Sequence, residues 1–136
     1  MLAANDYCRP RFTKLYAPKN LTGERKFRMA VQMIINQVGP LPITESFNSV
    51  GDSPMYLEVN GSVWTQTENQ MIGIDIALDG QVIGTAKIFS NGPTTHRTVV
   101  PAYIQVKLAQ GPHKLTLSAN NSVSDFNDWY TAVIHY

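Results

Sequence analysis

The segment Gln70–Ser90 constrains the fold of this chain most, because it predicts two antiparallel strands joined by a tight turn. Apolar residues alternate with polar or small ones from Ile72 to Leu78, and the alternation resumes from Val82 to Ile88. A period of two is typical of a strand with one buried face. Asp79-Gly80 separates the two runs, and this dipeptide tolerates the positive φ angles of hairpin turns. We therefore expect a central β-hairpin.

The turn and the apolar pattern of this hairpin predict different registers. A two-residue Asp-Gly turn would place polar residues opposite apolar ones, for example Gln81 opposite Leu78. One extra residue near Gln81 would instead pair Leu78 with Val82 and Ile74 with Ala86. Because a slip of one residue moves every side chain of a strand to the other face, the apolar pattern should decide the register. We predict a β-bulge near Gln81.

Everything after Pro40 reads as short strands separated by turn residues. Asn60-Gly61 could close a hairpin, or it could lie in one long strand. Pro101 indicates an edge position or a bend. This pattern predicts an all-β fold, an antiparallel β-sandwich or jelly roll, over residues 40–136. The expected strands lie within 40–50, 55–64, 70–78, 82–90, 98–108, 113–119 and 129–136.

Residues 21–39 predict one short α-helix ahead of the sandwich. Thr22 is a suitable N-cap, and Gly39-Pro40 would end the helix. The residues that would line its apolar stripe are Phe27, Ala30, Val31, Ile34, Ile35 and Val38. Spacings of four and three along Phe27, Val31, Ile34, Val38 and Leu41 also fit a coiled-coil seam over two heptads. Such a helix would either cover its own sandwich or form a trimeric stalk with copies of itself.

Length and composition limit the class of protein. A chain of 136 residues fits one domain, and residues 1–20 predict an N-terminal arm without clear periodicity. The formal net charge of +1 gives no reason to expect nucleic acid or an anionic membrane as a partner. Cys8 is the single cysteine, so no internal disulfide is expected. We see no signal peptide and no apolar run long enough to span a bilayer, which predicts a soluble protein without membrane insertion.

The residues that carry chemistry form no recognised catalytic motif. His96, His113 and His135 lack the spacing of zinc ligands. Asp125, Asn127 and Asp128 could supply oxygens to calcium, but Asx turns and loop hydrogen bonds explain such a cluster better. The sequence has no nucleophile elbow and no glycine-rich phosphate loop. We therefore expect no catalytic residues, no metal and no cofactor.

Aromatic residues with polar neighbours are the better functional lead. Tyr56, Trp64, Tyr103 and Trp129 could stack on sugar rings, although packing in the core or at a subunit contact is the commoner role for each one taken singly. Loops on rigid scaffolds commonly carry recognition, so loops at one end of the sandwich are the expected site. The candidate ligand-binding residues there are His96, Asp125, Asn127, Asp128 and Trp129.

Four segments resemble the jelly-roll heads of bacteriophage tail or fibre proteins, a fold related to tumour-necrosis-factor-like heads. They are IDIALDGQVIG at 74–84, His96 with the following Val99-Val100-Pro101, LAQGPHKLTL at 108–117 and SDFNDW at 124–129. The resemblance covers about residues 41–136, and residues 20–39 resemble the short helix that precedes such heads.

The resemblance implies a non-enzymatic homotrimeric attachment head in the virion, made in the host cytoplasm, that binds a host-surface glycan or protein. Other tail proteins would then contact residues 1–20. An alternative is a structural or adaptor subunit of a tail or capsid without its own ligand, and a less favoured one is a small polysaccharide hydrolase. The residues expected at the trimer contact are Phe27, Val31, Ile34, Val38 and Tyr136.

Overall fold

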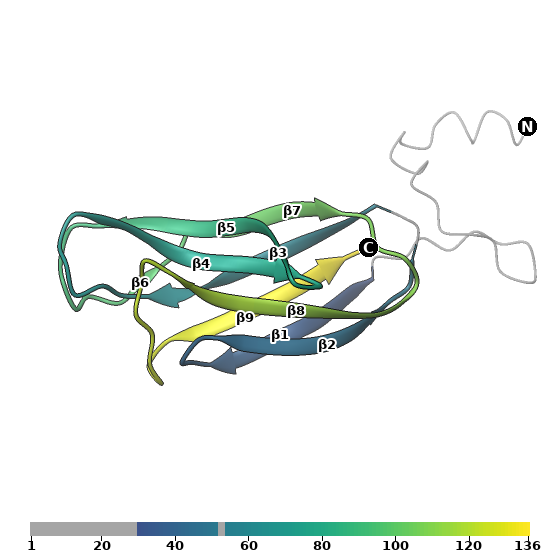
Figure 1. Ribbon diagram of the computed structural model, residues 1–136, viewed down its shortest axis with the longest axis horizontal. Coiled ribbons are helices and arrows are strands. Elements are labelled where there is room, and N and C mark those ends of the chain that lie inside the picture. The colour runs from purple at the N-terminus through teal and green to yellow at the C-terminus, as the bar shows by residue number, and fades with distance from the viewer. Residues whose placement is uncertain (1–29, 52–53) are drawn as a thin grey trace, which may run out of the picture. The chain divides into compact units, whose positions relative to one another are not determined.

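A computed structural model of the chain describes residues 30–51 and 54–136 (Figure 1). All regular elements within these residues are β-strands. They are β1 (Val31–Val38), β2 (Ile43–Ser49), β3 (Met55–Val63), β4 (Gln70–Leu78), β5 (Gln81–Ser90), β6 (Arg97–Thr98), β7 (Ala102–Val106), β8 (Gly111–Asn120) and β9 (Trp129–His135). In this part of the chain, no helix has the length and apolar character needed to cross a membrane.

The strands form two antiparallel sheets that lie face to face (Figure 1). One sheet has the order β1-β9-β3, with β7 and the short β6 both pairing with β3 along its free side. The other sheet has the order β2-β8-β4-β5. This alternation of strands between a five-stranded and a four-stranded sheet is the jelly-roll topology. The predicted antiparallel sandwich is confirmed.

The β4–β5 hairpin has both the two-residue Asp79-Gly80 turn and the register that the apolar pattern favours. Asp79 and Gly80 have φ angles of 51° and 86°, and the turn pairs Leu78 with Gln81. A bulge then shifts the register between Ile76 and Ala77, and beyond it Ile74 pairs with Ala86 as the apolar pattern requires. The predicted bulge near Gln81 is confirmed, with Ile83 as the unpaired residue, but the predicted Leu78–Val82 pair is wrong because the two-residue turn pairs Leu78 with Gln81.

The helix predicted over 21–39 is wrong for residues 31–38, which form strand β1. β1 pairs with β9, and a bulge shifts the register between Met33 and Ile35. Because the bulge breaks the alternation of faces, the apolar residues of this strand fall at spacings of three and four that imitate a helix. Residues 21–29 lie outside the described residues. The sandwich therefore begins at Val31 rather than at residue 40, and no helical seam runs through Val31, Ile34 and Val38.

The core lies between the two sheets and consists mainly of inward-facing aliphatic residues, together with Phe47, Met55 and Tyr130. Ile74 and Ile76 of β4 face Leu57 and Val59 of β3 across this layer, and all four are essentially inaccessible. Each fully buried side chain of this kind contributes about 1.5–3 kcal/mol relative to an exposed one.

Asn60-Gly61 lies within strand β3 and forms no turn, and Gly61 is needed there for packing. A Cβ at this position would lie 2.5 Å from Cδ1 of Tyr130, which fills the core beside it. The glycine is therefore needed for the close approach of the Tyr130 ring and not for a turn.

Candidate functional site

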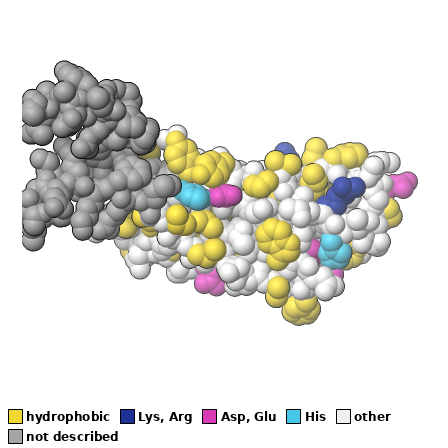
Figure 2. Space-filling model, turned by 180° about the vertical axis from the view of Figure 1, so that it is seen from behind, with side chains coloured by type: hydrophobic (Ala, Val, Ile, Leu, Met, Phe, Trp, Pro, Cys, Tyr) yellow, Lys and Arg dark blue, Asp and Glu magenta, His cyan; other side chains and the backbone are white. Residues whose placement is uncertain are grey.

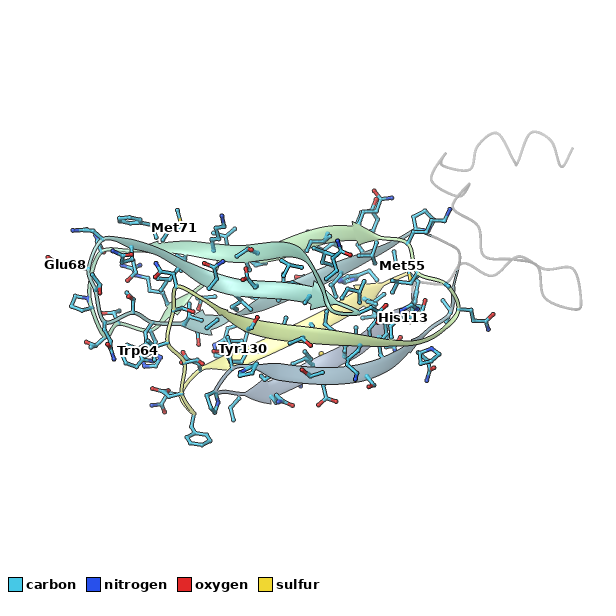
Figure 3. All side chains as sticks on the ribbon, in the orientation of Figure 1. Met55, Trp64, Glu68, Met71, His113 and Tyr130 are labelled. Atoms are coloured by element: carbon cyan, nitrogen blue, oxygen red, sulfur yellow. The ribbon has the colours of Figure 1, made fainter. Side chains whose placement is uncertain are left out.

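Four connections of the sandwich meet at one end, which we call the loop end. They are the β1–β2 connection (39–42), the β3–β4 connection (64–69), the β5–β6 connection (91–96) and the β8–β9 connection (121–128). Trp64 and Val123 exchange two backbone hydrogen bonds, and Thr94 N–H donates to Thr65 O over 2.7 Å. Trp64 and Glu68 lie at this end in Figure 3. These backbone hydrogen bonds tie the connections of the loop end to one another.

Asp128 is the centre of the polar network at the loop end. Its side chain is completely buried, and its carboxylate accepts three hydrogen bonds. The donors are Ser62 Oγ (2.7 Å), His96 Nδ1 (2.7 Å) and the Asp125 N–H (2.9 Å). A buried carboxylate needs such donors, because burial without them costs several kcal/mol. Asp128 thus fixes β3 and two loops to one another.

The connection of residues 124–128 has the predicted Asx-turn character. The Asn127 N–H donates to Asp125 Oδ1 over 2.8 Å, and the Asp128 N–H donates to Asp125 O over 3.1 Å. An Asp side chain that caps the amide two residues ahead is the defining contact of this turn. The Asp125 side chain remains 40% exposed.

The Ser62, Asp128 and His96 side chains do not form a nucleophilic triad. In such a triad the histidine lies between the serine and the carboxylate, so that it can accept the serine proton. Here both Ser62 Oγ and His96 Nδ1 donate to the same carboxylate oxygen of Asp128. The carboxylate therefore holds the hydroxyl in place and gives Ser62 no base.

His96, Asp125 and Asp128 lie close enough together to hold a cation, with one ligand atom of each within 4.8 Å of the others. Asp128 could join a cation only by giving up hydrogen bonds from Ser62 and His96. The remaining pair, His96 Nε2 and Asp125 Oδ2, lies 3.8 Å apart and is partly exposed. Two such groups are fewer ligands than zinc or calcium sites use, but they suit hydrogen bonds to a polar ligand.

Trp64 lies beside this pair of groups, with its ring 5.8 Å from the His96 ring at an interplanar angle of 41°. Trp129 follows Asp128 in the chain and is 38% exposed, and its backbone N–H donates to Ser62 Oγ over 3.3 Å. The structure thus brings His96, Asp125 and Asp128 into one network, with Asn127 and Trp129 beside it in the chain. That these five residues bind a ligand stays a prediction.

A cavity of about 350 Å³ also opens at the loop end. Its lining is neutral and mostly polar, with hydroxyl and amide groups from the β3–β4 and β8–β9 connections. The lining residues are Thr65, Gln66, Thr67, Ala119, Asn121, Ser122 and Val123.

A second polar and aromatic cluster lies on the outer face of the β1-β9-β3-β7 sheet, and it brings together Tyr56 and Tyr103, two of the aromatic candidates, with Glu58 and His135, which were not among the predicted ligand-binding residues. Tyr56 and Tyr103 stack at 5.6 Å with an interplanar angle of 16°, and the Tyr103 ring lies 5.7 Å from His135. His135 Nε2 lies 2.9 Å from Glu58 Oε1. Figure 2 shows a face of the molecule where hydrophobic side chains lie around a histidine and an acidic side chain. We call Tyr56, Glu58, Tyr103 and His135 the face cluster.

The sequence alone predicts only part of the face cluster. Alternation in β3 places Tyr56 and Glu58 on the polar side, opposite Leu57 and Val59. The pairing of β3 with β7 and β9, which brings Tyr103 and His135 beside them, joins segments about 45 and 77 residues apart.

A third histidine, His113, fastens the β4–β5 turn to β8 (Figure 3). Its Nδ1 lies 2.6 Å from Asp79 Oδ2 and its Nε2 lies 2.8 Å from Ala109 O. The hydrogen bond to Asp79, followed by the one to Ala109 O, raises the pKa of His113. The hydrogen bond from His113, followed by that from the Lys114 N–H, lowers the pKa of Asp79. This histidine has a structural role.

The residues predicted at a trimer contact occupy different environments. Val31 and Val38 are 57% and 55% exposed, whereas Ile34 packs against the core. Tyr136 is half-buried and its hydroxyl donates to Gln32 Oε1. Phe27 lies outside the described residues.

No family model matches the chain, and no curated protein matches it in sequence. Among solved structures, the C-terminal domain of EclA, a sugar-binding protein, is 14% identical with a TM-score of 0.42, over 87% of this chain and 89% of that one. A family 35 carbohydrate-binding module from Clostridium thermocellum is 16% identical with a TM-score of 0.40, over 77% and 90%. An infectious bursal disease virus structure is 18% identical with a TM-score of 0.41, over 79% of this chain and 33% of that one. At these identities and TM-scores, the similarities carry no argument about ligand or assembly.

Proposed function

We propose that this chain is a non-enzymatic recognition head that binds a glycan at its loop end. The observation that carries the proposal is the fixed position of the His96 ring. Asp128 binds Nδ1, so Nε2 remains beside the partly exposed Asp125 carboxylate. A donor or acceptor nitrogen next to a carboxylate can hydrogen-bond adjacent hydroxyls of a sugar, and neighbouring Trp64 and Trp129 supply aromatic surface.

The neutral cavity beside this network supports a glycan ligand. Its hydroxyl and amide groups match the hydroxyls of a sugar without requiring a counter-charge.

The biological setting that we propose is the one implied by the sequence resemblance, a homotrimeric attachment head of a phage tail or fibre that contacts a host-surface glycan. Its localisation in a virion and the docking of residues 1–20 on other tail proteins belong to this proposal. Exposed apolar residues on edge strand β1, such as Val31 and Val38, support a contact with another subunit.

The proposal is tested by incubating the labelled full chain with an array of neutral, sialylated and sulfated oligosaccharides. We expect saturable binding to at least one glycan, with affinity lowered about tenfold by Asp125→Asn or His96→Ala. Glu45→Gln, on strand β2 of the other sheet, is the matched control for loss of a carboxylate. If the native chain binds no glycan on the array, the proposed function is refuted.

A further inference from the structure

We propose that the face cluster is a second glycan-binding surface, which stacks a sugar ring of a neutral glycan on Tyr103 and hydrogen-bonds its hydroxyls through Glu58 and His135. This inference rests on the proposed function, glycan recognition, and adds a site and a ligand class to it. The cluster lies on the outer face of the β1-β9-β3-β7 sheet, on rigid strands rather than on loops.

Tyr103 is the stacking platform of this surface. Its side chain is 60% exposed, yet its ring is held by Tyr56 at 5.6 Å and by His135 at 5.7 Å. A ring already fixed by its neighbours loses little conformational entropy when a ligand covers it. Tyrosine also offers a large apolar face and a hydroxyl in one rigid side chain, which suits recognition of amphipathic ligands.

Glu58 and His135 supply the polar contacts. Their hydrogen bond joins Oε1 to Nε2, and the side chains are 39% and 31% exposed. A carboxylate has two oxygens and an imidazole two nitrogens, so each group keeps one further polar atom for a hydroxyl. Polar groups fixed beside an aromatic ring are what orients a sugar on such a surface.

The charge of this face selects a neutral ligand. Strands β1, β3, β7 and β9 contain one carboxylate, Glu58, one histidine, His135, and no lysine or arginine. A sialylated or sulfated glycan would bring its anion to Glu58 without a cation from these strands to balance it. Repulsion between like charges therefore disfavours anionic ligands here.

The same polar pair argues against a second copy of this chain as the occupant. A protein surface that covered the cluster would bury the Glu58 carboxylate and the His135 imidazole at the centre of the contact, where removing a carboxylate from water is costly. Charged residues are depleted from the cores of protein interfaces for this reason. Sugar hydroxyls would instead leave both groups hydrogen-bonded.

The test is calorimetric titration of the full-length protein and its variants with neutral oligosaccharides built from glucose, galactose, mannose or N-acetylglucosamine, and with their sulfated counterparts. We expect Tyr103→Ala to weaken binding of a neutral oligosaccharide about tenfold or more and Glu58→Gln to weaken it about threefold. The matched control is Phe89→Ala, which removes a 50% exposed aromatic residue from β5 in the other sheet. It should leave the affinity unchanged. Tyr103→Phe keeps the ring and should retain most of the binding.

The outcomes separate this inference from the proposed function. Binding that is lost in His96→Ala but unaffected in Tyr103→Ala would overturn the second surface and leave the loop end as the glycan site. Preference for the sulfated oligosaccharides would refute the charge argument. A change in sedimentation mass in Tyr103→Ala would assign the cluster to a subunit contact instead. If the native protein binds none of the oligosaccharides, the proposed function falls, and this inference falls with it.

Discussion

Replacing Asp128 tests the structural basis of the loop end. Asp128→Ala removes the acceptor of the Ser62 hydroxyl, the His96 Nδ1–H and the Asp125 N–H. Ser62 is 5% exposed and cannot turn to water, so its unpaired hydroxyl costs about 2 kcal/mol. His96 and Asp125 are partly exposed and can be resolvated, so each loses less than about 1 kcal/mol. We expect the free energy of unfolding to fall by about 3 kcal/mol in total.

Equilibrium unfolding in urea measures this loss. Fluorescence of Trp64 reports on the network, because its ring contacts the His96 ring. Asp128→Asn keeps an oxygen for Ser62 and His96 but turns its NH₂ toward the Asp125 N–H, so we expect a loss of about 1–2 kcal/mol.

The control for these variants is Glu68→Gln, which changes an exposed carboxylate in the β3–β4 connection and should alter stability by less than about 0.5 kcal/mol. An Asp128→Ala protein within about 1 kcal/mol of the native one would refute the view that this carboxylate fixes the loop end. A variant that fails to fold agrees with it, and the Asn variant then provides the measured value.

Three further predictions concern stability and assembly. The raised pKa of His113 stabilises the fold below its ordinary value of 6.5, and this is lost as pH rises through the folded-state pKa. The lowered pKa of Asp79 stabilises it above 3.8, and this is lost as pH falls through its folded-state pKa. We therefore expect His113→Gln to lower the free energy of unfolding by about 1 kcal/mol or less, mostly between pH 4 and 6.5, as measured by thermal melts across this range. If the variant shows the same pH dependence of stability as the native protein, the stabilising role of the His113–Asp79 hydrogen bond is refuted. Gly73→Ala places a Cβ 2.2 Å from Ala86 O, so it should lower the free energy of unfolding by about 2 kcal/mol or more in urea, whereas an undiminished stability would contradict the packing of this hairpin. Sedimentation equilibrium of the full chain should give a mass about three times 15.1 kDa, and a stable monomer would exclude the proposed trimer.

The sequence predicts those parts of the fold whose partners are close in the chain. The β4–β5 hairpin is an example, because strand alternation and the Asp79-Gly80 turn both lie within 21 residues. The apolar pattern alone could not assign the bulge to a particular residue. The turn fixes the first pair, and the core fixes the pairs beyond Ile76, so the extra residue lies between them.

The helix prediction for the residues of strand β1 was wrong because the pairing partner of this strand is far away in sequence. Val38 pairs with Trp129, and the bulge near Ile34 places apolar residues at helix-like intervals. Nothing local distinguishes this spacing from a helix, whereas pairing with β9 supplies backbone hydrogen bonds and burial of Ile35. Tertiary contacts therefore decide the conformation of this segment.

The candidate site was predicted in part for a similar reason. Loops at one end of a sandwich lie close together, which is why His96 and Asp125 could be assigned to one region from the chain order. The Asp128 hydrogen bonds to Ser62 and His96 join residues 66 and 32 positions apart and have no signature in spacing. The face cluster depends on three strands in register, so only the structure reveals it.

The most direct test of glycan recognition is an NMR titration of the full chain with a neutral oligosaccharide retained on the array, followed through the ring resonances of its histidines and tyrosines. We predict saturable shifts of His96 at the loop end and of His135 and Tyr103 on the sheet face, with His113 unchanged as the internal control. A titration in which none of these three rings responds would contradict the claim that this jelly roll recognises glycans.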